Sequence, residues 1–195
     1  MSQSIKIVSF DPSLRNWGIA QGQLIVNNQS VIEQVTVDQI SVIKPNLTTG
    51  KQVRQNSLDL ESANQLYNSA HQATIGCKVI FVEVPVGSQS SRAMASYGIC
   101  VGVLGALRAS GIPLFEVTPN EVKLASVGSK TASKAEMINW AVNLHPEAGW
   151  PMSRGSVVAG KAEHMADAIA TIYAGIKTQP FQQILPFLNQ SPNQT

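Results

Sequence analysis

Four side chains that could bind a metal ion or move a proton lie within or beside apolar segments of the chain. Asp11 follows the apolar run IKIVSF, and Glu83 interrupts the apolar run in CKVIFVEVP. His164 and Asp167 are three residues apart in a segment of helical periodicity, so they share one face of a predicted helix. A carboxylate in an apolar segment destabilises the fold unless a partner compensates its charge. These segments hold few basic residues, so we expect a divalent cation to compensate them.

Magnesium suits such a group because it prefers oxygen ligands, keeps several waters and needs few protein carboxylates. We expect Asp11, Glu83, His164 and Asp167 to bind two Mg²⁺ ions, with Mn²⁺ as a substitute, if two strands and a helix bring them together. A two-metal centre activates a water molecule and stabilises the leaving oxygen of a phosphodiester. Glu163 is an alternative ligand to His164, and the sequence leaves that choice open. Each residue taken alone also fits a structural role, such as a turn or a solvent-facing helix position.

The elements that must position these residues follow from hydrophobic periodicity. The predicted strands are 5–10, 17–26, 31–37, 78–84 and 113–117. The predicted helices are 57–73, 91–110, a segment beginning near residue 119, 133–144 and 163–176. Three consecutive strands without an intervening helix predict an antiparallel meander, and the later alternation of strands and helices predicts parallel strands. The sequence therefore predicts an α/β fold with a mixed five-stranded sheet flanked by helices.

The chain of 195 residues, 44% of them hydrophobic, is long enough to bury a core without disulfides. Cys77 and Cys100 are therefore predicted to be reduced core residues. The Pro- and Gly-rich stretch 145–160 predicts a long loop, and the polar tail 179–195 is predicted to be partly disordered. We expect one domain over 1–178, followed by that tail.

Charge and targeting signals narrow the function only slightly. Fourteen basic and twelve acidic residues give a net charge of +2, which neither requires nor opposes a nucleic-acid partner. Residues 84–162 hold seven Lys or Arg against four Glu, an excess of three positive charges. The N-terminal segment lacks the pattern of a signal peptide, and the longest uncharged run is shorter than the roughly 20 residues of a membrane span. We expect a cytoplasmic protein, in the host cytoplasm if the gene is viral, with no membrane partner.

Four stretches of the chain resemble the RuvC-type Holliday junction resolvases of the RNase H-like nuclease superfamily, with features of phage-type members. The resemblance covers about residues 5–175 and rests on IVSFDPSLRNWGIA, VIFVEVPVGSQSSRAMASYGICVGVLGAL, LFEVTPNEVKLASVGSKTASKAEM and HMADAIA. The family carries an Asp at the end of its first strand, a Glu ending its fourth, and an acidic residue or His three before an Asp-Ala on its last helix. These positions correspond to Asp11, Glu83, His164 and Asp167.

The resemblance implies a homodimeric, magnesium-dependent endodeoxyribonuclease that resolves four-way (Holliday) junctions and other branched DNA by paired symmetric nicks. It implies that Lys123 and Lys134, with Lys130 between them, lie near the scissile phosphate, and that helix 91–110 forms the dimer interface. Arg92, at the start of that helix, is a further candidate contact to the DNA backbone. Such an enzyme would act in DNA recombination and repair.

Two departures from the family pattern bear on specificity. The usual Asp-Pro-Gly after the first strand is Asp11-Pro12-Ser13, and the aromatic residue that follows the catalytic Glu in bacterial members is replaced by Val84-Pro85-Val86. Stacking on an aromatic side chain contributes about 1–3 kcal/mol per base, so its loss weakens the expectation of strict junction specificity.

Two other functions remain open from the sequence. Another RNase H-like nuclease, acting on RNA/DNA hybrids, RNA or flaps, would use the same metal site. An actin-like ATP-binding module also begins with an Asp after its first strand. That fold needs a second phosphate loop with Asp-Gly-Gly chemistry, which the chain lacks, and about twice its length.

Overall fold

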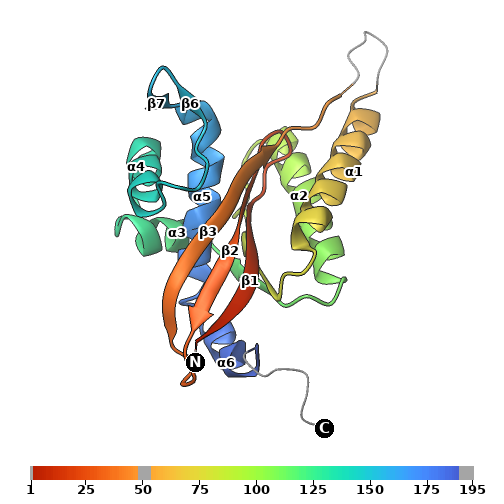
Figure 1. The fold of residues 1–195 in the computed structure, drawn as a ribbon. Coiled ribbons are helices and arrows are strands. Elements are labelled where there is room, and N and C mark those ends of the chain that lie inside the picture. The colour runs from red at the N-terminus through yellow and green to blue at the C-terminus, as the bar shows by residue number, and fades with distance from the viewer. Residues whose placement is uncertain (1, 48–53, 189–195) are drawn as a thin grey trace.

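The computed structural model describes residues 2–47 and 54–188 and has a central mixed sheet (Figure 1). Its five strands lie in the order β3-β2-β1-β4-β5. They are β1 (Gln3–Asp11), β2 (Trp17–Val26), β3 (Ile32–Ile43), β4 (Val79–Glu83) and β5 (Leu114–Val117). β1, β2 and β3 pair as an antiparallel meander, whereas β4 pairs parallel with both β1 and β5. The predicted fold class is therefore confirmed.

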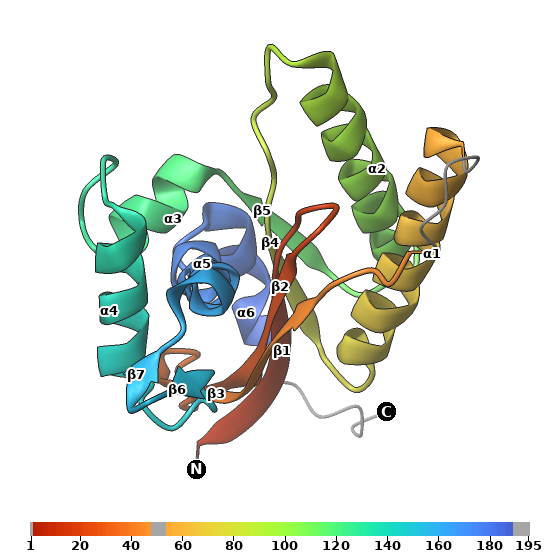
Figure 2. The ribbon, with the colours of Figure 1, turned by 90° about the horizontal axis from the view of Figure 1, so that it is seen from above.

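Helices cover both faces of this sheet (Figure 2). α1 (Gln55–Thr74) and α2 (Ser91–Arg108) lie on one face. α5 (Ala159–Gly175) lies directly on the other, with α3 (Pro119–Ser126) and α4 (Lys134–Leu144) packed outside it. The C-terminal α6 (Gln179–Leu188) follows α5 and lies beyond its C-terminal end (Figure 1). Among the described residues, no helix has both the length and the hydrophobicity to cross a membrane.

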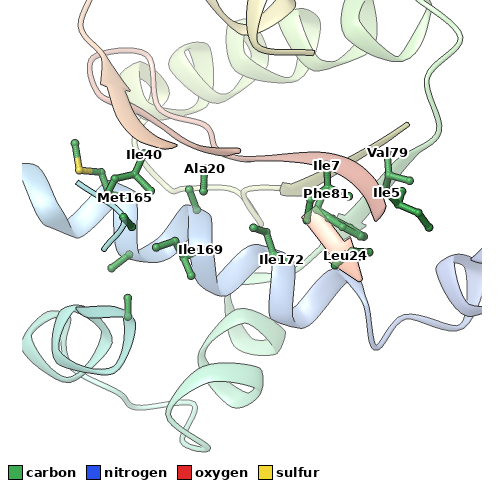
Figure 3. Close-up of a cluster of buried hydrophobic side chains, with 14 of the residues drawn as sticks. Ile5, Ile7, Ala20, Leu24, Ile40, Val79, Phe81, Met165, Ile169 and Ile172 are labelled. Carbon is green, nitrogen blue, oxygen red and sulfur yellow. The ribbon is translucent and has the colours of Figure 1, made fainter. Parts of the chain in front are cut away.

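The sheet is buried on both faces because β1 alternates between two hydrophobic clusters. Ile5 and Ile7 belong to the cluster beneath α5, whereas Val8 and Phe10 belong to the cluster beneath α1 and α2. Successive side chains of a strand point to opposite faces, so each face receives every second residue. Figure 3 shows Ile169 and Ile172 of α5 lying against the first of these clusters.

α5 lies close to the sheet because small or polar residues stand where they touch. Gly175, at the end of α5, has no Cβ, and a Cβ at this position would overlap the ring of Phe81 in β4. The hydroxyl of Ser9 in β1 donates a 2.6 Å hydrogen bond to the carbonyl oxygen of Ala168 in α5. This buried bond ties the middle of the helix to β1.

The predicted loop 145–160 is more ordered than expected. α5 begins at Ala159, four residues before the predicted start. The predicted loop 145–160 contains a short hairpin of β6 (Met152–Ser153) and β7 (Ser156–Val157), whose turn places Arg154 at φ 50° and Gly155 at φ 78°. The helix predicted near residue 119 begins after Thr118, which forms a capping box with Glu121.

The predicted tail from residue 179 begins with a helix that packs on the core. Residues 179–188 form α6, whose Phe181 and Leu185 are buried. The ring centroid of Phe181 lies 5.1 Å from that of Phe81 and 5.4 Å from that of Phe115. The polar composition concealed four apolar residues at helical spacing, namely Phe181, Ile184, Leu185 and Leu188. The folded unit thus extends past 178, and residues 189–195 lie outside the described residues.

Candidate active site

Asp11 and Glu83 lie at the carboxyl ends of two neighbouring parallel strands. In β1 the alternation of Ile5 and Ile7 toward α5 continues through Ser9 to Asp11, so Asp11 faces α5. In β4, Val79 and Phe81 face α5, which places Glu83 on the same side. The register pairs Phe10 with Val82, and one residue further along it Asp11 stands beside Glu83.

Gly18 is the reason that α5 can bring its polar residues to Asp11. It is the β2 partner of Asp11 in the sheet register. A Cβ at Gly18 would overlap the carbonyl oxygen of His164. The missing side chain lets the helix backbone rest on the sheet next to Asp11. His164 and Asp167, one turn apart on α5, therefore lie above the ends of β1 and β4.

Asp11 and His164 are joined directly across this contact. Nδ1 of His164 and Oδ2 of Asp11 are 2.7 Å apart, and both side chains are largely buried. The hydrogen bond to Asp11 raises the pKa of His164 against the opposing effect of burial. The pair therefore favours the positively charged imidazolium more than an exposed His would.

Glu83 and Asp167 carry the clearest electrostatic signature of the site. Burial, followed by repulsion from Asp11 and Asp167, raises the pKa of Glu83 to about 8. Burial, followed by repulsion from Asp11 and Glu163, raises the pKa of Asp167 to about 7. Shifts of this kind require carboxylates that share a poorly solvated space. The four predicted catalytic residues are thus brought together at the carboxyl ends of β1 and β4.

The predicted DNA-contact lysines occupy different positions around this cluster. Lys123 of α3 is half-buried, and its charge lowers the pKa of both Glu83 and Asp167, so it lies beside them. Lys134, at the start of α4, forms an ion pair with Glu163. Lys130 is exposed in the turn after α3, without an ion pair to another described residue.

Arg92 lies away from the carboxylate cluster, at the start of α2. Its Nη1 and Nη2 donate hydrogen bonds of 2.6 Å each to the carboxylate of Asp59 on α1. Glu163, the alternative to His164, has Lys134 as its partner, whereas His164 contacts Asp11. His164 is thus hydrogen-bonded to a carboxylate of the cluster, whereas Glu163 is paired with Lys134 although it lies near enough to raise the pKa of Asp167.

The donor set fits a divalent cation by its chemistry. Three carboxylates and one imidazole share a small space, and the two most buried carboxylates are each raised in pKa by their neighbours. A doubly charged cation removes that repulsion and uses the oxygen ligands that Mg²⁺ prefers. Within residues 2–47 and 54–188, however, no three of these groups already surround a single point at metal-ligand distances. The Asp11–His164 hydrogen bond uses Oδ2 of Asp11 and Nδ1 of His164, which leaves Oδ1 of Asp11 and Nε2 of His164 as donors for a cation.

Sequence reasoning missed the residues that hold the cluster together. Ser9 and Gly18 read as ordinary strand residues, and their role depends on α5, which is more than 140 positions away in the chain. A glycine within a continuous apolar strand is nevertheless a signal of close backbone approach. The Asp59–Arg92 pair had no signal, because Asp59 lies outside every quoted stretch and the pairing depends on how α1 packs against α2.

The overall fold of the chain resembles those of two solved proteins. The RuvC of Thermus thermophilus, in a complex with a Holliday junction substrate, is 19% identical, with a TM-score of 0.60 over 87% of this chain and 92% of that chain. The yeast mitochondrial Holliday junction resolvase Ydc2 is 17% identical, with a TM-score of 0.60 over 94% of this chain and 81% of that chain. No protein-family model and no curated protein sequence matches the chain. The chain has the fold of the RuvC-type Holliday junction resolvases.

Proposed function

We propose that the protein is a magnesium-dependent endonuclease that resolves four-way junctions and other branched DNA by paired symmetric nicks. The observation that carries the proposal is the convergence of Asp11, Glu83 and Asp167, with His164, in one buried cluster. The two resolvases with the same fold support the choice of substrate, since one of them was solved with a Holliday junction.

The chain's own residues suit hydrolysis of a phosphodiester. Asp11, Glu83, Asp167 and His164 would hold divalent cations, which supply activation of water and neutralisation of charge on the leaving 3′ oxygen. Lys123 lies beside Glu83 and Asp167, where its ammonium group would attract the scissile phosphate. The Asp11 carboxylate orients the imidazole of His164 through the 2.7 Å hydrogen bond.

Paired nicks require two active sites, and α2 is the surface that we propose joins two copies. Its outer face exposes Met94 and Val101, with relative exposures of 46% and 47%. Gly98, Gly102 and Gly105 of the same helix have open space where a side chain would stand. A helix with this face allows close approach by a second copy, and a two-fold axis would relate the two sites. Val101→Arg is expected to give monomers in light scattering, with single nicks in place of paired ones.

The direct test is cleavage of a synthetic four-way junction in the presence of Mg²⁺. Asp11→Asn and Glu83→Gln should each lower the single-turnover rate at least 100-fold. Glu116→Gln is a matched control, because Glu116 lies on neighbouring β5 but pairs with Arg108 at the surface. Equal rates for the wild type and the two site variants would refute the nuclease assignment.

Three further measurements test the assignment, and the comparison of substrates separates it from other RNase H-like nucleases. Binding of the junction without Mg²⁺ should survive in Asp11→Asn and Glu83→Gln, because backbone phosphates are bound by other residues. Faster cutting of an RNA/DNA hybrid or a flap than of the junction would assign the same site to another RNase H-like nuclease. Replacing Mg²⁺ with Mn²⁺ should preserve the activity.

A further inference from the structure

A hollow of about 520 Å³ lies between α1 and the loop that joins β1 to β2, on the face of the sheet opposite α5. Leu14 and Arg15 line it from the loop between β1 and β2, Lys44 lines it from the segment after β3, and Leu58 from α1. Figure 2, which views the molecule from above, shows that loop between α5 and the pair of helices α1 and α2. We call this hollow the Arg15–Lys44 pocket.

The charge of the pocket is positive and is not cancelled from within. Its one lining carboxylate, Asp59, accepts two hydrogen bonds from Arg92, so these two charges neutralise each other. Arg15 and Lys44 are exposed, and neither forms an ion pair with any residue in the described ranges. Within the part of the chain that the structure describes, the positive charges of Arg15 and Lys44 therefore remain unpaired at the opening of the pocket.

The helix end in the wall adds to this preference for an anion. The first turn of α1 contributes Gln55 and Leu58 to the lining. Arg54, at the N-cap position, provides no side-chain hydrogen bond to that turn, although its carbonyl oxygen accepts from the amides of Ser57 and Leu58. An uncapped N-terminus of a 20-residue helix carries partial positive charge. A guanidinium, an ammonium and the remaining amides of that turn together match the oxygens of a phosphate.

The pocket lies within reach of the carboxylate cluster along the chain. Arg15 is four residues after Asp11, which limits their Cα separation to about 14 Å. That distance is about four nucleotides at the 3.4 Å rise of a DNA strand. Lys123 stands on the α3 side of the cluster, and the pocket stands on the α1 side. A strand passing over the ends of β1 and β4 could therefore meet a positive charge on each side of the scissile phosphate.

We propose that the Arg15–Lys44 pocket binds a backbone phosphate of the DNA strand, a few nucleotides from the site of cleavage. This inference rests on the proposed function and identifies where the uncut part of the strand is held. Asp59 keeps Arg92 in the pocket wall, so Arg15 and Lys44 make the phosphate contact. The pocket reads no base, because phosphate contacts set position rather than sequence preference.

The test is the salt dependence of binding to a synthetic four-way junction without Mg²⁺, measured by fluorescence anisotropy. Each neutralised phosphate contributes about 0.9 to the slope of log affinity against log salt. Because the pocket binds one phosphate, Arg15→Ala with Lys44→Ala should reduce that slope by about 0.9 and weaken binding at least 10-fold. Lys6→Ala with Lys78→Ala is the matched control, since it also removes two exposed positive charges, but from the opposite end of β1 and β4.

Charge-conserving and single-turnover measurements complete the design. Arg15→Lys with Lys44→Arg should restore the wild-type slope. At saturating protein with Mg²⁺, the Lys6→Ala, Lys78→Ala control should cut at a rate within a few-fold of wild type, because it keeps the carboxylate cluster and, unlike the Arg15→Ala, Lys44→Ala variant, the pocket. An unchanged slope in the Arg15→Ala, Lys44→Ala variant would refute the proposed phosphate contact. An equal decrease in the Lys6→Ala, Lys78→Ala control would refute it as well. A wild type that binds with the predicted slopes but does not cut would overturn the proposed nuclease function and leave the pocket standing.

Discussion

Replacing Glu83 with Gln should make the metal-free protein more stable although it removes a catalytic group. The pKa of Glu83 is raised from 4.5 to about 8, first by burial and then by Asp11 and Asp167. This displacement corresponds to a free energy of about 5 kcal/mol in favour of the protonated form. Ionising Glu83 in the folded protein is therefore costly, whereas ionising it in the unfolded chain is not.

The sign of the pH dependence follows from proton binding. Between pH 4.5 and about pH 8 the folded state holds the Glu83 proton and the unfolded state releases it. The free energy of unfolding must then fall as the pH rises through this window. From Glu83 alone the loss is about 4 kcal/mol between about pH 5 and about pH 9. The Gln side chain carries no such proton, so the variant escapes this loss.

The assay is urea unfolding with EDTA at both pH values, for wild type, Glu83→Gln and Glu116→Gln. At about pH 9, Glu83→Gln should be more stable than wild type by about 2–4 kcal/mol, the lower value allowing for burial of the amide. Near pH 5 the two should differ little. Glu116→Gln loses only a surface ion pair with Arg108 and should lose at most about 1 kcal/mol.

Adding Mg²⁺ supplies a second, independent readout of the same carboxylate. Mg²⁺ at 100 times its dissociation constant should stabilise wild type by about 2.7 kcal/mol. The gain for Glu83→Gln should be smaller because an oxygen ligand with negative charge is gone. If Glu83→Gln is less stable than wild type at about pH 9, ionising Glu83 does not destabilise the folded protein. The argument from its raised pKa would then be refuted.

Three further variants test the packing and pairing around the site. Gly18→Ala should lower the free energy of unfolding by about 1–3 kcal/mol in urea and abolish cleavage, whereas Gly160→Ala, with open space around it, should do neither. Phe181→Ala should cost about 3–5 kcal/mol in the same assay, and an unchanged value would mean that α6 does not belong to the core. Asp11→Asn should lower the pKa of His164, followed by its imidazole NMR signals in metal-free protein, and an equal pKa would exclude the hydrogen bond between them.

The fold was predictable where burial depends on local pattern. The strand 17–26 was predicted with its observed bounds, because its apolar residues and the Asn-Asn turn after it define both ends. Helix and strand types were right along the chain up to residue 144. The prediction fell short in β3, which runs to Ile43 rather than to residue 37, and in 145–188, where one short hairpin and α6 depend on contacts with distant elements. Phe181 packs on Phe81, one hundred positions earlier, and no local signal announces such a contact.

The composition of the candidate site was predictable, but its supports were not. A carboxylate in an apolar strand stands out because burying it is costly, so Asp11 and Glu83 were visible in the sequence. Arg92 shows the opposite case. Its contact with DNA stays a prediction, but nothing in the sequence indicated its two hydrogen bonds with Asp59 between α2 and α1. Which exposed cation has a partner depends on the packing of two helices, and the sequence does not encode that locally.

The contacts of Ser9 and Gly18 with α5 explain why cation binding and fold stability should be coupled. Repulsion among Asp11, Glu83 and Asp167 would be relieved if α5 moved away from the sheet. The buried hydrogen bond from Ser9 to the helix and the close approach at Gly18 oppose that movement. The repulsion must instead be met by protonation or by a cation. Because the fold keeps these carboxylates near one another, the metal-free protein should lose stability at high pH, and a cation that binds them should restore it.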